Sequence, residues 1–310
     1  MTSYDTIIIG GGPAGLSAGI YAMRSGLNTV LVEKFMPGGQ MTIIDFVENY
    51  PGFPSGVGGP ELSAAMEQQA RSLGLEIIST EVRSIDFSGL EKAVTTADGE
   101  LRAPTVIIAT GATPCKLGVP GEDRLTGKGV SYCATCDGAF FRDKEIAVVG
   151  GGNTAVQDAV FLTRFAGKVT VIHRRDALRA TKILQERAFK NPKIEIAWSS
   201  TVVEIQGDQK VESLVLENVK DGSRRTVPVD GVFVLIGTDP ITEFVRGQVV
   251  LDPAGYIITD EEMHTSVTGI FAAGDCRRKS LRQMVTAAAD GAIAAVSAER
   301  YLESLKDKTL

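Results

Sequence analysis

The sequence is poor in the residues that mark several classes of protein. Four cysteines and two histidines occur among 310 residues, and so few cysteines exclude a small secreted scaffold held by disulfides. No run is dense in lysine and arginine, and the formal net charge is −6, so we expect no nucleic-acid partner. The uncharged stretch at 6–23 contains five glycines and a proline, and no lysine or arginine precedes it. This is atypical of a membrane span or signal peptide, so we expect a cytoplasmic protein with no membrane partner.

Glycine, in contrast, is abundant. The chain has 34 glycines, where a typical usage of ~7% would give about 22. Their irregular spacing excludes a collagen-like repeat and predicts many places where the backbone turns tightly or approaches another group closely. Hydrophobic residues make up 44% and charged residues 23% of the sequence, as in ordinary globular proteins. At ~100–200 residues per domain, we expect two domains.

The same order of elements occurs twice along the chain. Apolar stretches at 6–9 and 145–149 each precede three consecutive glycines and a helical stretch. A second apolar strand is predicted at 29–32 after the first helix and at 169–172 after the second, so each region forms a βαβ unit. The sequence therefore predicts an α/β fold with two related dinucleotide-binding domains.

Further elements follow from hydrophobic periodicity and turn residues. Apolar positions on one face predict a helix over 60–74, and an alanine-rich stretch predicts another over 283–303. Asp98-Gly99 predicts a tight turn. The remaining predicted strands cover residues 76–87, 92–97, 105–109, 201–206, 211–217, 225–228, 230–237 and 269–273.

The first glycine loop has the pattern Gly10-x-Gly12-x-x-Gly15. Such glycines let backbone N–H groups approach a pyrophosphate at a helix N-terminus, although the pattern alone also occurs in ordinary turns. Here it follows a strand, opens a helix, and is followed by Glu33, 23 residues after Gly10. An acid that binds a ribose hydroxyl is expected ~20 residues on. The loop therefore predicts a site for a dinucleotide without a 2′-phosphate, either FAD or NAD.

The second glycine loop lies 140 residues further on and is followed by basic residues. Where the first loop has Glu33, the second has His173, and the next positions carry Arg174, Arg175 and Arg179. A carboxylate there would repel a 2′-phosphate, whereas guanidinium groups match phosphate geometry. A solvated basic face is the plain alternative. The position of these residues favours NADP-type binding.

A Cys-x-x-Cys motif lies between the two loops. Cys133 and Cys136 have the spacing of a redox dithiol. Half of a zinc site is the alternative, but no second pair of ligands is present, because Cys115 and Cys276 stand alone; we expect no metal. A purely structural disulfide would constrain little unfolded chain. Asp137 beside the motif is a candidate proton donor to a leaving thiolate, or else a helix cap or solvated acid.

Two dinucleotide loops around a redox dithiol resemble the low-molecular-weight thioredoxin reductases over nearly the whole chain. The order and spacing of the motifs carry the resemblance, because no single motif is specific. The matching segments are GGGPAG at 10–15, GGQ at 38–40, VENYPGF at 47–53, ATGATP at 109–114, CATCDG at 133–138, GGGNTA at 150–155, HRRDALRA at 173–180, GIFAAGD at 269–275 and RQMVTAAADG at 282–291.

The resemblance implies two Rossmann-like, three-layer domains, with the NADPH domain inserted into a split FAD domain. The FAD domain would comprise 1–112 and 246–310, and the NADPH domain, 113–245, would carry the Cys-x-x-Cys motif. The resemblance also implies a homodimer. The crossings between domains, near 112–117 and 240–247, are the hinge candidates.

The same resemblance assigns cofactor-binding residues. For FAD it implies Gly10, Gly12, Pro13, Ala14, Gly15, Glu33, Lys34, Gly39, Gln40, Asn49, Val82, Ala109, Gly111, Gly274, Asp275, Arg282, Gln283 and Met284. For NADPH it implies Gly152, Asn153, Thr154, His173, Arg174, Arg175 and Arg179. Members of the family often have Glu-Glu where this chain has Gln157-Asp158, which leaves the relative use of NADPH and NADH open.

The implied activity is thioredoxin-disulfide reduction. Hydride would pass from NADPH to FAD and then to the Cys133–Cys136 disulfide, while the NADPH domain rotates between two arrangements. Cys136 would face the flavin, Cys133 would attack the disulfide of thioredoxin, and Asp137 would protonate the leaving thiolate. The alternatives are a related flavin disulfide reductase or dithiol oxidase acting on another small redox protein or small disulfide, and a non-catalytic redox sensor.

Overall fold

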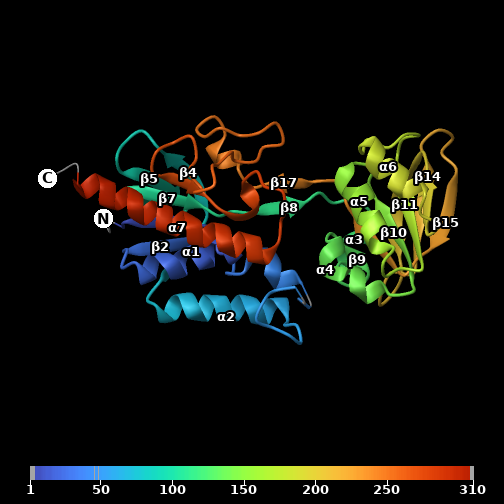
Figure 1. Cartoon of the computed structure of the whole chain (residues 1–310), viewed down its shortest axis with the longest axis horizontal. Coiled ribbons are helices and arrows are strands. Elements are labelled where there is room, and N and C mark those ends of the chain that lie inside the picture. The colour runs from blue at the N-terminus through green and yellow to red at the C-terminus, as the bar shows by residue number, and fades with distance from the viewer. Residues whose placement is uncertain (1–3, 45, 48, 308–310) are drawn as a thin grey trace. The chain divides into compact units, whose positions relative to one another are not determined.

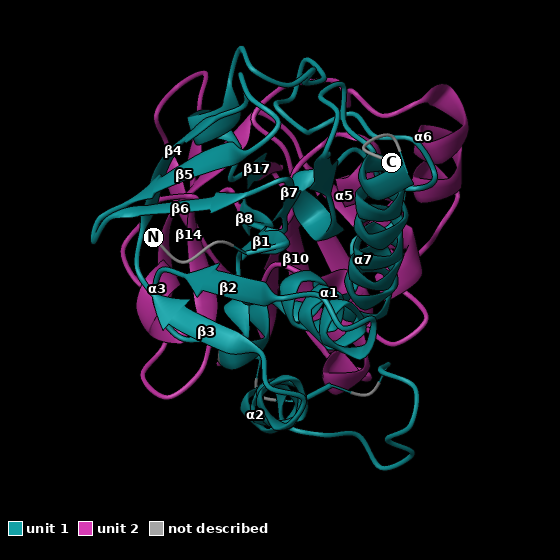
Figure 2. Ribbon diagram, turned by 90° about the vertical axis from the view of Figure 1, so that its left-hand side faces the viewer, with its two compact units in different colours: residues 1–113, 239–310 teal, residues 114–238 magenta. Residues whose placement is uncertain are grey.

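The computed structural model describes residues 4–44, 46–47 and 49–307, so Glu48 of the VENYPGF segment lies outside the described residues. The chain divides into two compact units (Figures 1 and 2). Unit 1 comprises Met1–Thr113 and Asp239–Leu310, and unit 2 comprises Pro114–Thr238. The sequence analysis expects the inserted domain to end at residue 245, whereas unit 2 ends at Thr238. Val245 itself is fully buried in the core of unit 1.

Unit 1 is built on a five-stranded sheet in which every pair of neighbours is parallel. Its strand order is β18 (Ile270–Ala272), β7 (Thr105–Ile108), β1 (Thr6–Ile9), β2 (Thr29–Glu33) and β3 (Glu76–Ser79). The helices are α1 (Pro13–Arg24), α2 (Gly59–Ser72) and α7 (Met284–Asp307), with short 3-10 turns η1 (Gly39–Ile43), η3 (Glu243–Val245) and η4 (Gly274–Cys276).

The strands of this sheet are apolar on both faces because both faces are covered. Ile8, Leu31 and Ile107 pack with side chains of the helices, whereas alternate residues such as Ile7 and Val106 pack against a second, antiparallel sheet. That sheet consists of β4 (Val82–Asp86), β5 (Lys92–Thr96) and β6 (Glu100–Ala103). The result is three layers, as expected for a dinucleotide-binding domain.

The predicted strand at 76–87 is two strands in two sheets. β3 extends the parallel sheet, and the chain then turns at Thr80, whose N–H donates to the Glu33 carbonyl, before β4 begins the antiparallel sheet. The predicted turn at Asp98-Gly99 is confirmed. Gly99 has φ of +151°, and its carbonyl accepts the Thr96 N–H at 2.7 Å.

Unit 2 repeats the three-layer plan. Its parallel sheet has the order β12 (Ile194–Ala197), β11 (Lys168–Ile172), β10 (Glu145–Val149), β16 (Gly231–Val234) and β9 (Val130–Ser131). One face packs on α5 (Asn153–Leu162), and the other packs on an antiparallel sheet. The remaining elements are β13 (Ser200–Gln206), β14 (Ser213–Asn218), β15 (Arg224–Pro228), α3 (Glu122–Leu125), α4 (Ala134–Asp137), η2 (Gly138–Phe141) and α6 (Lys182–Phe189).

Two short strands, β8 (Ala112–Pro114) and β17 (Thr238–Pro240), pair where the chain passes between the units. The sequence did not predict these strands, nor α6 and β12. Ala188 is the single buried residue of α6, so the helix leaves no apolar stripe to detect. Among the described helices, none is both long enough and apolar enough to cross a bilayer.

Candidate active site

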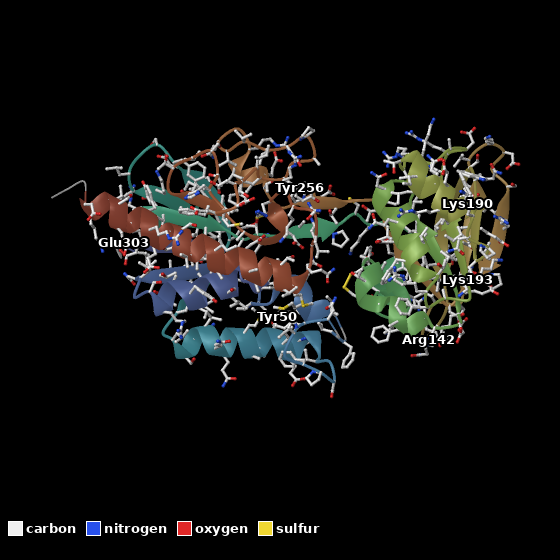
Figure 3. The ribbon with its side chains drawn as sticks, viewed as in Figure 1. Tyr50, Arg142, Lys190, Lys193, Tyr256 and Glu303 are labelled. Carbon is white, nitrogen blue, oxygen red and sulfur yellow. A yellow bond between two sulfur atoms is a disulfide. The ribbon has the colours of Figure 1, made fainter. Side chains whose placement is uncertain are left out.

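The dithiol lies at the start of a four-residue helix in unit 2. Cys133 is the residue immediately before α4, and Cys136 is within it. The two form a disulfide, with Cα atoms 5.3 Å apart, which appears as a yellow bond in Figure 3. Both residues are half-buried. The expected pairing is therefore present, and the bond is in a segment that solvent reaches.

Ser131 connects the dithiol to the neighbouring acid. Its hydroxyl donates to Asp137 Oδ2 at 2.6 Å and accepts the Cys133 N–H at 3.1 Å. The serine side chain is buried, at 4% exposure, at the end of β9. The carboxylate of Asp137 is thus fixed beside the backbone of Cys133. Sequence reasoning missed Ser131, because a serine before a cysteine motif carries no distinctive pattern.

A buried glutamate anchors the same segment from the other side. Glu122 accepts hydrogen bonds from the Tyr132 hydroxyl at 2.9 Å and from the N–H groups of Leu117 and Gly118 at 2.9 and 2.7 Å. Burial raises the pKa of Tyr132 above its usual range, so the phenol stays protonated and keeps donating. Tyr132 directly precedes Cys133. The hydrogen bond from Tyr132 to Glu122 therefore holds the chain in place where the dithiol motif begins.

The first glycine loop forms a tight support for the start of α1. A Cβ on Gly15 would collide with the Gly10 carbonyl, which shows how closely the helix approaches the strand end. Gly12 is the residue before the helix, Pro13 is its first residue, and a Cβ on Gly12 would meet no atom within 4 Å. The backbone here is open to a ligand, as a pyrophosphate at a helix N-terminus requires. Ala14 is buried behind it.

Glu33 contacts this loop directly. Its Oε2 accepts the Gly11 N–H at 2.6 Å, and its Oε1 accepts the Phe35 N–H at 3.0 Å. Each carboxylate oxygen can accept a further hydrogen bond, so a ribose hydroxyl remains compatible with this arrangement. The adjacent Lys34 pairs with Glu81 at 2.6 Å on the surface.

The second half of unit 1 supplies buried polar atoms that lack partners. Among the described residues, three buried polar side-chain atoms have no hydrogen bond, and two of them, Asp275 Oδ1 and Arg282 Nε, belong to this segment, while the third is Thr80 Oγ1 between β3 and β4. Burial raises the pKa of Asp275. The Arg282 guanidinium lies 4.1 Å from the ring centroid of Tyr256, which is labelled in Figure 3. Buried polar atoms are ordinarily satisfied, so these two fit a polar ligand such as a flavin dinucleotide.

Several other residues implied for FAD also have defined surroundings. The Asn49 amide donates to Gln283 Oε1 at 2.9 Å, which brings together two residues 234 positions apart. Gly39 lies against Gly12, with an added Cβ 3.4 Å from the Gly12 Cα. Gln40 is exposed, Ala109 is buried, Gly111 has open space beside it, Gly274 packs near Ala14, Met284 packs on the helix-side core, and Val82 packs on the core between the sheets.

The second glycine loop rests on an imidazole. A Cβ on Gly151 would collide with the ring of His173, whose Nε2 lies 3.1 Å from the Ala177 carbonyl. His173 is 5% exposed, and burial lowers its pKa. The protein itself therefore surrounds this ring, and a contact between His173 and NADPH stays a prediction. As in the first loop, a Cβ on Gly152 would meet open space.

The arginines that follow are exposed. Within the described part of the chain, no carboxylate lies within ion-pair distance of Arg174, Arg175 or Arg179. Guanidinium groups left in this state can receive a phosphate without first breaking an ion pair. Asn153 Oδ1 accepts the Thr181 N–H at 2.8 Å, and Thr154 is exposed on the first turn of α5.

The remaining cysteines do not resemble redox centres. Cys276 is fully buried, and burial raises its pKa to about 11, so its thiol is a poor nucleophile. Cys115 is half-buried and forms no disulfide.

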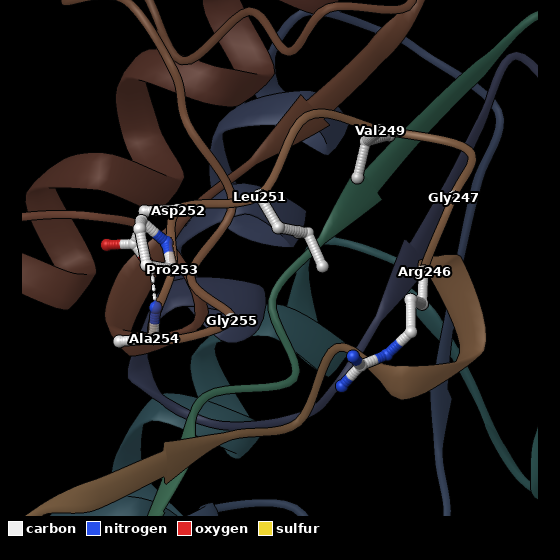
Figure 4. A pocket seen from close by; sticks show the side chains of 8 residues that line it. All are labelled: Arg246, Gly247, Val249, Leu251, Asp252, Pro253, Ala254 and Gly255. Atoms are coloured by element: carbon white, nitrogen blue, oxygen red, sulfur yellow. Dashed lines mark hydrogen bonds between the residues drawn. The ribbon is translucent and has the colours of Figure 1, made fainter.

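No group of three or more potential metal ligands occurs among the described residues. Two hollows on the described surface add little to the site. One of 390 Å³ is lined by eight residues between Arg246 and Gly255 (Figure 4), and one of 500 Å³ is lined by residues 49–54, which include Asn49.

Comparisons with known proteins agree along nearly the full length. The family model for pyridine nucleotide-disulphide oxidoreductases matches residues 4–291. A thioredoxin reductase of Listeria innocua is 50% identical over 305 residues, which is 98% of this chain and 95% of that protein. One from Peptoclostridium acidaminophilum is 50% identical over 307 residues, 97% of this chain and 98% of that protein.

A solved structure extends this agreement to three dimensions. The thioredoxin reductase from Streptococcus pyogenes has 51% sequence identity and a TM-score of 0.93, covering 97% of this chain and 99% of that one. The chain therefore belongs to the pyridine nucleotide-disulphide oxidoreductases and, within them, to the low-molecular-weight thioredoxin reductases.

Proposed function

We propose that this chain uses NADPH to reduce the disulfide of a thioredoxin through its own Cys133–Cys136 pair. The observation that carries the proposal is a half-buried disulfide next to a fixed carboxylate, in a unit whose second glycine loop is followed by exposed arginines. Relatives named thioredoxin reductase at 50% identity support the choice of partner. Thioredoxin is a protein with a solvent-accessible redox disulfide, which suits exchange with a half-buried dithiol that solvent reaches.

The cofactors of this family are FAD and NADPH. When bound, the flavin supplies two-electron chemistry that connects a nicotinamide hydride to a disulfide. We propose that unit 1 holds FAD. Gly12 and Pro13 would support the pyrophosphate, Glu33 a ribose, and Asp275 and Arg282 the polar groups nearer the flavin. The orphaned Asp275 Oδ1 and Arg282 Nε support this assignment.

We propose that unit 2 binds NADPH. Gly152, Asn153 and Thr154 lie at the start of α5, where backbone N–H groups suit a pyrophosphate. Arg174 and Arg175 would hold the 2′-phosphate through charge-assisted hydrogen bonds. Arg179 would assist from the same loop, since its backbone N–H is fixed to the Gly151 carbonyl at 2.8 Å.

Thiol–disulfide exchange then follows from the positions of the dithiol residues. Two electrons, supplied by NADPH through FAD, would first reduce the Cys133–Cys136 disulfide to two thiols. The Cys133 thiolate then attacks one sulfur of the partner disulfide, so a bond forms to Cys133 and the partner's second sulfur leaves as a thiolate. Asp137 would first take up a proton from solvent, then give it to that thiolate and return to a carboxylate. The Cys136 thiolate attacks Cys133, which re-forms the Cys133–Cys136 disulfide and releases the reduced partner. Ser131 keeps the Asp137 carboxyl group beside Cys133 throughout.

The distribution of the proposed functional residues over two units also implies that the units move relative to each other during the reaction. The dithiol and the basic loop both belong to unit 2, whereas the residues proposed for FAD belong to unit 1. One flavin face cannot serve both at the same time, so we propose that unit 2 rotates about the two crossings at 113/114 and 238/239. We also propose a homodimer in the cytoplasm, where the reducing environment suits a dithiol reductase.

The test is NADPH oxidation by the purified, FAD-loaded protein with and without thioredoxin. We expect turnover to depend on thioredoxin, and Cys133→Ser to lower it by more than about a hundredfold while NADPH still bleaches the flavin. Cys115→Ser is the matched control and should keep the wild-type rate. Thioredoxin reduction by Cys133→Ser at the wild-type rate would refute the exchange mechanism. Equal NADPH consumption without thioredoxin, matched by oxygen uptake, would instead indicate a dithiol oxidase.

A further inference from the structure

A buried cluster of charges in unit 1 has no part in the chemistry described above. Asp290 lies on α7, and its Oδ2 is 2.7 Å from Lys279 Nζ and 3.7 Å from Arg277 Nη1. The exposed fractions of the Lys279, Asp290 and Arg277 side chains are 7%, 11% and 12%. Buried ion pairs contribute little to stability on balance, because desolvation offsets their attraction. What these charged residues contact is therefore a better guide to their role than their contribution to stability.

The same carboxylate oxygen also accepts a backbone N–H from the residue that precedes Asp275. Gly274 N–H donates to Asp290 Oδ2 at 3.1 Å, in a buried setting. Gly274 has φ of +77°, a conformation that favours glycine. A side chain could not be accommodated there in any case, because a Cβ would come within 2.8 Å of the Ala14 Cβ. Asp290 thus fixes a tight turn directly against the helix that begins at the first glycine loop.

The next residue along each segment continues this contact. Gly291 follows Asp290 and packs so closely on α1 that a Cβ would collide with the Ala14 carbonyl. Asp275 follows Gly274 and carries the buried, unpartnered Oδ1. Lys279 and Asp290 are both close enough to influence the ionisation of Asp275, in opposite directions. One ion pair therefore contacts the backbone next to an acid implied for FAD binding and contributes to the charges around that acid, together with Arg282.

We propose that Asp290 and Lys279 are positioning residues for FAD. Asp290 orients the Gly274–Asp275 turn through the Gly274 N–H, and Lys279 holds Asp290 in place and neutralises its buried charge. This inference rests on the proposal that unit 1 binds FAD. The sequence offers one retrospective sign, since Asp290 is the single charged residue in the alanine-rich stretch at 284–298.

The experiment measures FAD affinity of the apoprotein by quenching of flavin fluorescence, together with the thermal unfolding midpoint without FAD. Asp290→Ala should raise the Kd for FAD by about ten- to a hundredfold, because a charge-assisted hydrogen bond to the turn is lost. Asp290→Asn, which keeps the side-chain shape and an acceptor oxygen, should raise it by about fivefold. Lys279→Met should lie between the two variants. Ser297→Ala, which alters another buried polar residue of α7, should leave the Kd unchanged.

The outcomes separate the possible explanations. An apoprotein that melts earlier but binds FAD with the wild-type Kd would show a purely structural cluster and overturn the proposal. If Asp290→Ala does not fold, the proposal is decided by Asp290→Asn and Lys279→Met, and wild-type affinity in both would overturn it. A wild-type protein that fails to bind FAD would refute the proposed function instead.

Discussion

The two glycine loops have similar backbone geometry, but the first contacts an acidic side chain and the second contacts an imidazole. In unit 1 the carboxylate of Glu33 accepts the N–H of Gly11. In unit 2 the imidazole of His173 fills the equivalent place below Gly151, and exposed arginines follow it. Both loops present open space at the next glycine. The comparison teaches that the same loop geometry occurs in both units, whereas the residue at the end of the second strand differs in charge. We propose that this difference, with the arginines that follow His173, distinguishes the nucleotides.

The largest expected effect tests the arginines of unit 2. The double variant Arg174→Ala/Arg175→Ala should raise the KM for NADPH by at least about a hundredfold and that for NADH by less than about threefold. The physical reason is that two charge-assisted hydrogen bonds to the 2′-phosphate, each ~1.5–3 kcal/mol, are lost. Steady-state kinetics with both coenzymes measures this. Equal losses for the two coenzymes would mean that these arginines do not distinguish the phosphate.

The matching change in unit 1 should affect the other cofactor. Glu33→Ala is expected to raise the Kd for FAD by about tenfold, since a ribose acceptor and the partner of the Gly11 N–H are both removed. NADPH binding should not change, because its proposed residues belong to unit 2. Equilibrium titration of the apoprotein with FAD measures the effect, and Glu81→Ala, at the surface ion pair with Lys34, is the control. Unchanged FAD affinity in Glu33→Ala would mean that the acidic residue beside the first glycine loop does not bind FAD.

A smaller effect concerns the dithiol, which unit 2 has and unit 1 lacks. Ser131→Ala should lower kcat with thioredoxin by about fivefold, corresponding to a hydrogen bond of ~1 kcal/mol, while KM for thioredoxin and flavin reduction by NADPH stay unchanged. Ser131→Thr retains the hydroxyl and should restore most of the rate. Stopped-flow and steady-state measurements separate these steps. An equal loss in Ser131→Thr would indicate that packing, not the hydroxyl, is what matters.

The smallest expected effect is a pH dependence specific to unit 2. Burial lowers the pKa of His173 below its ordinary value, so the unfolded chain takes up a proton near pH 6.5 that the folded chain does not. Stability should therefore decline as pH falls through about 6.5. Asp158, whose pKa burial raises to about 6, contributes in the opposite direction. The difference in Tm between wild type and His173→Gln at pH 7.5 and 5.5 isolates the histidine, and a constant difference would contradict this account.

Much of the site could be predicted from sequence because its parts are local. A glycine loop, the strand before it and the helix after it lie within about 20 consecutive residues, and Cys133 and Cys136 are three apart. Asn49 and Gln283 could be assigned only through the family resemblance, since 234 residues separate the two atoms that bond. Ser131 was missed because its role depends on where Asp137 lies after one helical turn.

The sequence by itself determined the α/β class, the two glycine loops, the redox pair and the acidic and basic strand ends. Each is encoded by residues close together in the chain, where backbone geometry leaves few alternatives. The tertiary structure alone decided that His173 lies beneath Gly151, that β3 and β4 belong to different sheets, and that Asp290 fixes Gly274. Such contacts depend on how distant segments pack, and packing responds to shape and burial that no local pattern records.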